Sequence, residues 1–165
     1  MNNHKKQYSN DEILQFLTEV YDPEIPVLNI VEMGIVRNVE CKENEVRVDI
    51  TPTYSGCPAM NMIQEEIFLI LQKNNIENIK INTIYSPAWT TDWLSEETKK
   101  KLQEYGIAPP HQTNSNVTLI IPKNIECPFC QSAKTELRSE FGSTSCKSLY
   151  YCRECQQPFE YFKEI

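Results

Sequence analysis

The sequence predicts an α+β protein: a small α/β sandwich over residues 1–108, a linker or strand over 109–121, and a zinc β-ribbon over 122–165. Three observations predict this arrangement. Helical and strand patterns follow one another in the order α-β-β-α-β-α, which fits a compact sandwich with one small sheet. Two prolines and a polar run then interrupt these patterns. Two C-x-x-C pairs finally lie in the C-terminal tail at a spacing typical of zinc sites.

The first element is a helix predicted over Ser9–Tyr21. Ser9 and Glu12 form an S-x-x-E capping box, and an apolar stripe with helical spacing follows it. Asp22 precedes a proline and ends the helix, because the residue before a proline is pushed out of the helical region. A loop or extended segment over 22–33 then leads to the sheet.

A β-hairpin follows Gly34. Apolar and polar residues alternate over 35–41 and again over 46–50, which is the pattern of strands with one buried face. The residues Lys42-Glu43-Asn44 between these two runs are polar and predict the turn.

The second half of the sandwich is predicted as a helix, a strand and a helix. Pro58 suits the first position of a long amphipathic helix, which runs to near Asn74. A strand follows over 79–83, and Gly106 closes a last helix over Ser95–Tyr105. A short strand over Val117–Ile121 could belong to either domain.

Charge and hydropathy exclude two classes of partner. Residues 1–106 carry 10 Lys and Arg against 17 Asp and Glu, a net charge of −7, whereas residues 107–165 carry 6 of each sign. Neither half has the basic footprint of a nucleic-acid-binding protein. No apolar run approaches the roughly 18 residues of a membrane span, and the N-terminus lacks the apolar core of a signal peptide. We therefore expect a cytoplasmic protein that binds neither nucleic acid nor membrane.

The tail carries the most specific motif. Cys127 and Cys130 form one C-x-x-C pair, Cys152 and Cys155 form the other, and the 21 residues between the pairs suffice for a hairpin. Four thiolates close a tetrahedral shell, so the zinc is expected to be structural. The alternative reading is two redox dithiols. The strands are expected over 135–141, 149–151 and 158–162. Gln131 and Gln156 stand where glycine commonly follows each knuckle.

Two further cysteines are candidate functional thiols. Cys57 precedes a predicted helix, whose N-terminus lowers the pKa of a nearby thiol, and Gly56 allows an unusual backbone angle that would present the sulfur. The alternative is a buried helix-capping cysteine. Cys146 is a fifth cysteine in the tail, which the zinc does not need. The alternatives for it are a small buried residue, a free thiol in a turn, a substitute zinc ligand or a functional thiol. Cys41 is expected in the core.

The motifs in both halves resemble known families. The segments DPEIPVLNIVEMGIV and ITPTYSGCPAM resemble iron–sulfur assembly proteins of the SufT type. The segment SPAWTTDWLSEETKKKLQEYGIAPP and the cysteine-rich tail resemble the PaaD family, which is encoded with the phenylacetyl-CoA epoxidase system. The resemblance covers nearly the whole chain after residue 10.

The resemblance implies a function for the chain. It places the family's reactive cysteine at Cys57 and its Asp-Pro-Glu motif at Asp22 and Glu24, with Thr51 and Thr53 as supporting residues. It implies a non-catalytic maturation factor for the oxygenase and reductase components of the epoxidase. The cofactors would be structural zinc and a transient iron–sulfur cluster or iron. One thiolate cannot hold a four-ligand cluster, so we hypothesise that Cys57 and Cys146 meet in a homodimer or across the domain interface.

Three alternatives to a maturation factor remain open. A structural component of the oxygenase complex could use the ribbon as a docking surface, with its dense aromatics as the contact patch or, alternatively, as the ribbon's own core. A nucleic-acid-binding ribbon conflicts with the charge. A thiol enzyme acting through Cys57 lacks a histidine placed to activate it. The aromatics in question are Tyr150, Tyr151, Phe159, Tyr161 and Phe162.

Overall fold

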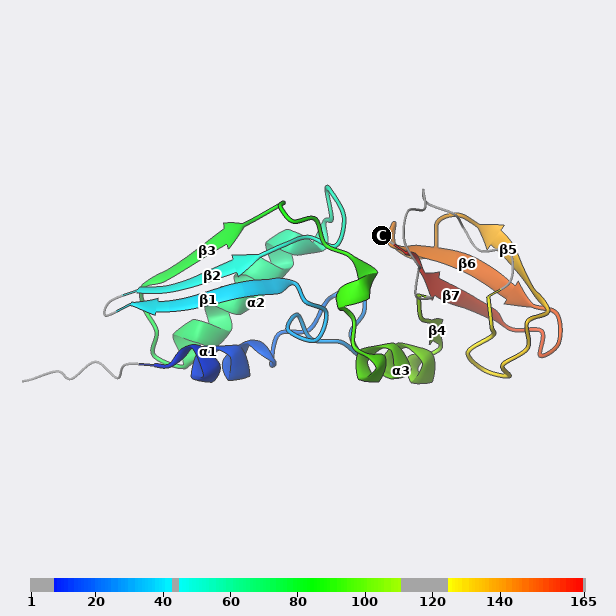
Figure 1. Cartoon of the computed structure of the whole chain (residues 1–165), viewed down its shortest axis with the longest axis horizontal. Coiled ribbons are helices and arrows are strands. Elements are labelled where there is room, and N and C mark those ends of the chain that lie inside the picture. Colours follow the sequence, from blue (N-terminus) through cyan, green and yellow to red (C-terminus); the bar gives the residue numbers. More distant parts are fainter. Residues whose placement is uncertain (1–7, 43–44, 111–124, 165) are drawn as a thin grey trace, which may run out of the picture. The chain divides into compact units, whose positions relative to one another are not determined.

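The computed structural model describes residues 8–42, 45–110 and 125–164, which form two compact units (Figure 1). One unit comprises the chain up to Pro52 together with Pro58–Ala88, and the other comprises Thr53–Cys57 and the chain from Trp89 onward. The predicted order of helices and strands is confirmed. No helix in the described part of the chain is long and apolar enough to cross a membrane.

The division between the units differs from the expected boundary at residue 108. Residues 89–108, which we expected to close the first domain, group with the second unit. The reason is a strand pair that the sequence pattern did not reveal, between β4 (Ile107–Ala108) and β7 (Pro158–Phe162). The expected strand over 117–121 and most of the expected linker lie outside the described residues.

The first unit is built on the three-stranded sheet β1-β2-β3. β1 (Val36–Lys42) and β2 (Glu45–Ile50) form the predicted antiparallel hairpin, whose turn residues 43–44 lie outside the described residues. β3 (Ile79–Thr83) runs parallel to β2, and α2 (Ala59–Lys73) makes the crossover between them. Figure 1 shows α2 behind this sheet. Its buried residues and those of β2 form the core, which includes Val46, Val48, Ile50, Ile63, Ile67 and Leu71.

Helix α1 (Asn10–Leu17) begins with the predicted capping box, because Ser9 and Glu12 each accept a hydrogen bond from the other's amide. The helix ends earlier than expected. The Thr18 hydroxyl donates to the carbonyl of Gln15 at 2.7 Å, and the following amides bond three residues back instead of four. This tighter turn stops the helix before the chain reaches Asp22-Pro23.

Helix α3 (Glu96–Tyr105) has the predicted caps. The Ser95 hydroxyl accepts from the amide of Thr98, and Gly106 ends the helix at φ 92° in the left-handed region. A Cβ at Gly106 would also lie 3.0 Å from the ring of Phe129. Both the backbone angle and this close approach require glycine there, and the chain then enters β4.

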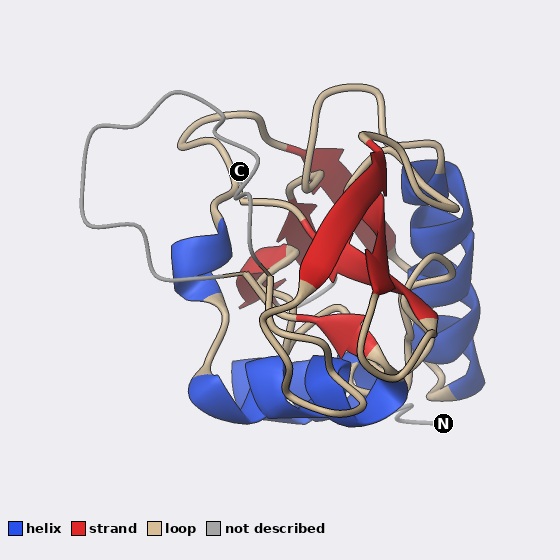
Figure 2. Ribbon diagram, turned by 90° about the vertical axis from the view of Figure 1, so that its right-hand side faces the viewer, coloured by secondary structure: helices blue, strands red, loops and turns tan. Residues whose placement is uncertain are grey.

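The second unit contains a four-stranded sheet in the order β4-β7-β6-β5. β5 (Thr135–Ser139), β6 (Lys147–Cys152) and β7 are antiparallel neighbours, and β4 runs parallel to β7. Figure 2 looks toward this end of the chain and shows strands that twist strongly. A single turn of 3₁₀ helix, η1 (Thr91–Trp93), precedes α3.

The aromatic residues of the second unit form its own core. Tyr150 stacks on Phe159 with the ring centroids 5.7 Å apart and meets Tyr161 edge-on at 5.9 Å. Burial raises the pKa of Tyr150 to about 12. Phe162 is also buried and Tyr151 is half-buried, so these rings hold the sheet together and offer little contact area. The core cluster consists of Ala108, Ile125, Cys127, Tyr150, Cys152, Phe159 and Tyr161.

The first sheet carries a buried carboxylate, Asp49, whose side chain accepts hydrogen bonds from Asn38, Arg47 and Asn82. Burial alone would raise the pKa of Asp49, but these hydrogen bonds outweigh it and hold the pKa below its usual value. The stabilisation is therefore present above the unfolded pKa of about 3.9 and is lost as the pH falls through the folded pKa.

We expect Asp49→Asn to lower the free energy of unfolding by about 1–2 kcal/mol at pH 7, because charge-assisted hydrogen bonds are lost. The difference from the wild type should begin to shrink below about pH 4 and should vanish once the pH lies below the lowered pKa of folded Asp49. Urea denaturation at pH 7 and below pH 4, followed by circular dichroism, measures the free energy of unfolding of the variant and the wild type. An equal difference at both pH values would mean that the ionised carboxylate contributes nothing.

Candidate functional site

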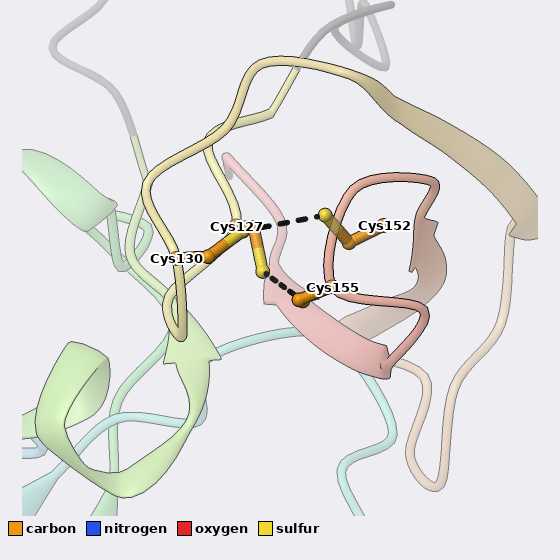
Figure 3. Close-up of side chains that lie close together, drawn as sticks. All are labelled: Cys127, Cys130, Cys152 and Cys155. Atoms are coloured by element: carbon orange, nitrogen blue, oxygen red, sulfur yellow. Dashed lines mark hydrogen bonds between the residues drawn. The ribbon is translucent and has the colours of Figure 1, made fainter.

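The four cysteines of the two C-x-x-C pairs converge in the second unit. Their sulfur atoms all lie within 4.8 Å of one another. The Sγ atoms of Cys127 and Cys155 are 3.6 Å apart, and those of Cys130 and Cys152 are 3.5 Å apart (Figure 3). Tetrahedral zinc with Zn–S bonds of about 2.3 Å requires sulfurs roughly 3.8 Å apart. The arrangement therefore fits a zinc ion held by four thiolates.

The two pairs form matching turns. In the first, the amide of Gln131 donates to the carbonyl of Cys127 at 2.8 Å, and the amides of Phe129 and Cys130 donate to the sulfur of Cys127. The second pair repeats the pattern, with two amides that donate to the sulfur of Cys152. Amide hydrogen bonds stabilise sulfur as a thiolate, which is the form that binds metal.

Gln131 and Gln156 take the backbone angle that glycine would take at these positions. Their φ angles are 60° and 59°, in the left-handed region. A side chain there costs on the order of 1 kcal/mol, which the surrounding turn must offset. The two glutamines therefore depart from the usual ribbon sequence without changing its backbone geometry.

The thiols of the site differ in acidity. Burial raises the pKa of Cys155 to about 12. Burial would also raise the pKa of Cys152, but the amides of Cys155 and Glu154 outweigh it and lower the pKa to about 7. Binding of a metal therefore has to displace protons, at least from Cys155.

Cys146 lies outside this group, directly before β6. Its side chain is buried, with 3% of its surface exposed, and its sulfur lies 3.1 Å from the hydroxyl oxygen of Thr144. Cys41 is half-buried rather than fully in the core, and burial, together with the charge of Glu12, raises its pKa. None of the seven cysteines forms a disulfide.

Cys57 lies at the end of the loop between β2 and α2 and is half-buried. Its amide donates to the carbonyl of Tyr54 at 3.2 Å. Gly56 has a φ of 84°, the unusual backbone angle that a glycine at this position allows. Nothing lies within 4 Å of the place that a Cβ added here would take. Cys57 precedes Pro58, the N-cap of α2, and no side chain caps this helix. The amides in the first turn of α2, which lie next to the Cys57 thiol in the sequence, therefore receive no hydrogen bond from a capping side chain.

Thr51 and Thr53 are both buried. The hydroxyl of Thr51 has no hydrogen-bond partner among the described residues, which is unusual for a buried polar atom. Thr51 directly follows β2, at the carboxyl end of two parallel strands, which is where α/β proteins commonly bind ligands. Sequence patterns identified Thr51 only as a member of a motif, because an unsatisfied hydroxyl leaves no trace in the sequence.

Asp22 and Glu24 form a turn. Asp22 is buried, and its carboxylate accepts hydrogen bonds from the amides of Glu24 at 2.7 Å and Ile25 at 2.9 Å. These hydrogen bonds give the aspartate of the Asp-Pro-Glu sequence a structural role, which is to hold the turn. Within the described residues, only the four ribbon cysteines form a group of three or more side chains able to hold a metal ion.

Family models match both halves of the chain. Residues 112–163 match the PaaD zinc beta ribbon domain, and residues 10–68 match the iron-sulfur cluster assembly protein domain. The ribbon match begins inside the stretch that we expected to be a linker. The chain thus joins the two domain types that the resemblance of its N-terminal segments and of its cysteine-rich tail had implied.

Curated relatives and solved structures agree with these matches. The chain is 44% identical to a protein of Escherichia coli named as a subunit of a putative 1,2-phenylacetyl-CoA epoxidase, over 93% of this chain and 92% of the relative. It is 35% identical to an Fe-S protein maturation auxiliary factor of Porphyromonas gingivalis, over 62% of this chain and 97% of that one. A crystal structure of a DUF59 domain from Bacillus anthracis, 28% identical, covers 56% of this chain and 90% of its own, with a TM-score of 0.53.

Proposed function

The chain belongs to the PaaD family, and from this membership we propose that it matures the metal centres of a multicomponent phenylacetyl-CoA epoxidase through the thiolate of Cys57. The observation that carries the proposal is the overlap of two relationships in one chain. Over 93% of its length it resembles a protein named as an epoxidase subunit, and its first part resembles factors named for Fe-S protein maturation. An accessory role within the epoxidase system accounts for both.

In this proposal the two cysteine sites have different tasks. The four ribbon cysteines hold zinc in a closed shell, so this ion has no open position for chemistry and serves to stabilise the fold. Cys57 is half-buried, at the start of a helix that no side chain caps, and could bind iron or a cluster as cargo. A thiolate of the client would then displace that of Cys57 by ligand exchange, with no change of oxidation state.

Cys57 supplies one ligand, so the remaining ligands must come from elsewhere. Cys146, a second copy of the chain or the cysteines of the client are the candidates. Asp22 acts in this scheme through the turn that it stabilises, and Thr51 offers an unsatisfied buried hydroxyl at the carboxyl end of β2 as a supporting group. We place this activity in the cytoplasm, where thiols stay reduced.

The experiment compares client oxygenase matured in cells with wild-type protein, Cys57→Ala, Cys146→Ala or no added chain. We expect Cys57→Ala to lower the iron content and activity of the client at least about tenfold, to the level without the chain, because no thiolate accepts the cargo. Thr51→Val should keep the stability, since its hydroxyl makes no hydrogen bond, but lower maturation. Full client activity with folded Cys57→Ala would end the proposal.

The name of the Escherichia coli relative, which makes it part of the epoxidase, favours a second candidate function, a structural component of the oxygenase complex. Stoichiometry separates the two. A structural component co-purifies with the mature oxygenase at a fixed ratio and is needed for turnover. A maturation factor becomes dispensable once the client carries its metal.

A further inference from the structure

The outer edge of β3 is the one sheet edge, in the part of the chain that the structure describes, with neither a register shift nor a very short strand. The edge strands β1 and β5 each carry a register shift, between Val36 and Asn38 and between Leu137 and Ser139, and β4 has only two residues. Bulges and short length are the usual ways to keep an edge from pairing with another chain. β3 has five residues in regular register with β2 and no proline, and its one charged residue, the exposed Lys80, lies on the opposite face of the sheet from Ile81.

A shallow apolar groove lies along this edge. It has a volume of about 440 Å³ and is lined by Gln64, Glu65, Phe68 and Leu69 of α2 and by Ile81 of β3. Phe68 and Leu69 are 41% and 56% exposed. Ile81 lies beside the buried Val48 in the sheet register but is only half-buried itself. Two large apolar side chains beside an open strand edge make a surface that another chain could cover.

We propose that this edge binds an extended segment of another protein as a fourth strand. The segment would form main-chain hydrogen bonds with β3, and its alternate side chains would enter the groove against Phe68, Leu69 and Ile81. This inference does not depend on the role of Cys57, because none of these residues belongs to either cysteine site. It concerns which proteins the chain recognises.

The charge of the groove indicates the chemistry of the segment. Glu65 lines it and Glu66 follows directly, and neither has an ionic partner among the described residues. Glu65 lies about one helical turn from Leu69, roughly 5–6 Å away, and alternate side chains of a strand are separated by about 7 Å. The groove therefore fits a segment whose alternate positions carry a Lys or Arg and then two apolar residues, so that the basic side chain lies near Glu65 and the apolar ones near Leu69.

A second copy of the chain fits less well. Its own β3 would bring a second Glu65 and Glu66 to the same edge, and the first 106 residues of each copy carry a net charge of −7. Two such helices brought to one edge would place like charges close together, and like charges repel one another. The occupant that the charges favour is thus a partner with basic residues.

The test uses a fluorescein-labelled peptide, KTVTVTVTK, with basic ends in both directions, and measures its binding to the zinc-loaded full chain by fluorescence anisotropy. We expect Phe68→Ser to weaken binding about tenfold and Glu65→Lys about fivefold, because the first removes apolar contact and the second reverses a charge. In NMR spectra the amide shifts should concentrate on Ile79–Thr83.

Met62→Ser is the matched control. Met62 is 56% exposed on the same helix but does not line the groove, so its loss should change binding less than about twofold. The peptide ETVTVTVTE tests the charge and should bind weakly. Equal binding of both peptides, shifts spread over the surface, or self-association of the chain through β3 would each overturn the proposal.

Discussion

Cys127→Ala is expected to abolish zinc binding and to unfold the sheet β4-β7-β6-β5, while the sheet β1-β2-β3 stays intact. Structural zinc sites contribute roughly 10–16 kcal/mol of binding free energy, which is as large as the whole stability of a typical domain. Cys127 and Cys152 also belong to the core cluster around Tyr150, so the metal links residues at the centre of this unit. Three thiolates would leave the zinc shell open to water.

The measurement combines zinc content with two-dimensional NMR of the full chain. Amides of β5, β6 and β7 should lose their dispersion in Cys127→Ala and in wild-type protein treated with a strong chelator, and amides of β2 should keep theirs. Cys146→Ala is the matched control, because Cys146 is a buried cysteine of the same unit outside the group of four. It should keep one zinc per chain. A dispersed ribbon spectrum without zinc would show that the metal is dispensable.

Local interactions made much of the fold predictable. The capping box of Ser9 and Glu12 and the left-handed Gly106 are settled within a few residues of chain, and the structure contains both. The end of α1 was predicted wrongly because the Thr18 hydroxyl competes for a helix carbonyl, and a threonine in a sequence does not reveal whether it will do so.

Contacts between distant residues were not predictable. β4 has only two residues, and its partners in β7 lie more than fifty positions away, so no periodic pattern marks the pair. That pair groups residues 89–108 with the ribbon and moves the division between the units. A single sequence records the preferences of each segment but does not show which segments meet.

The candidate sites divide in the same way. The four ribbon cysteines were predictable because the geometry of zinc fixes their spacing, and their sulfurs do converge. The left-handed backbone angle of Gln131 could not be predicted, because glutamine seldom adopts such an angle. The roles of Cys57 and Cys146 stay predictions, because both depend on a cargo or a partner.

Glu160→Ala is expected to lower the free energy of unfolding of the ribbon by about 3 kcal/mol, because it removes the carboxylate from a buried lysine. The ammonium of Lys147 lies 2.9 Å from Glu160, and its side chain is only 4% exposed. In the sheet register Lys147 lies opposite Phe162, which is itself buried. Glu160 also accepts a hydrogen bond from the amide of Ser143 and so holds the turn before β6.

The matched control is Glu136→Ala in the same sheet. Glu136 and Glu160 are similarly exposed, at 25% and 22%, but Arg153, a partner of Glu136, is 70% exposed and can return to water. The loss there should be much smaller than the loss at Glu160. Thermal unfolding of the zinc-loaded full chain measures both variants. Equal losses would mean that the burial of Lys147 does not determine the strength of its ion pair.

The same pair predicts a pH dependence that separates charge from shape. Burial alone would raise the pKa of Glu160, but the Ser143 amide and the Lys147 ammonium outweigh it and hold the pKa below its usual value. The stabilisation is thus complete above the unfolded pKa of about 4.3 and disappears as the pH falls through the folded pKa. Glu160→Gln keeps the shape and an acceptor for the Ser143 amide. Its deficit should be large at pH 7 and should shrink as the pH falls below about 4.3, over the range in which zinc analysis shows that the four cysteines still hold their metal, whereas a deficit caused by lost packing would not change with pH.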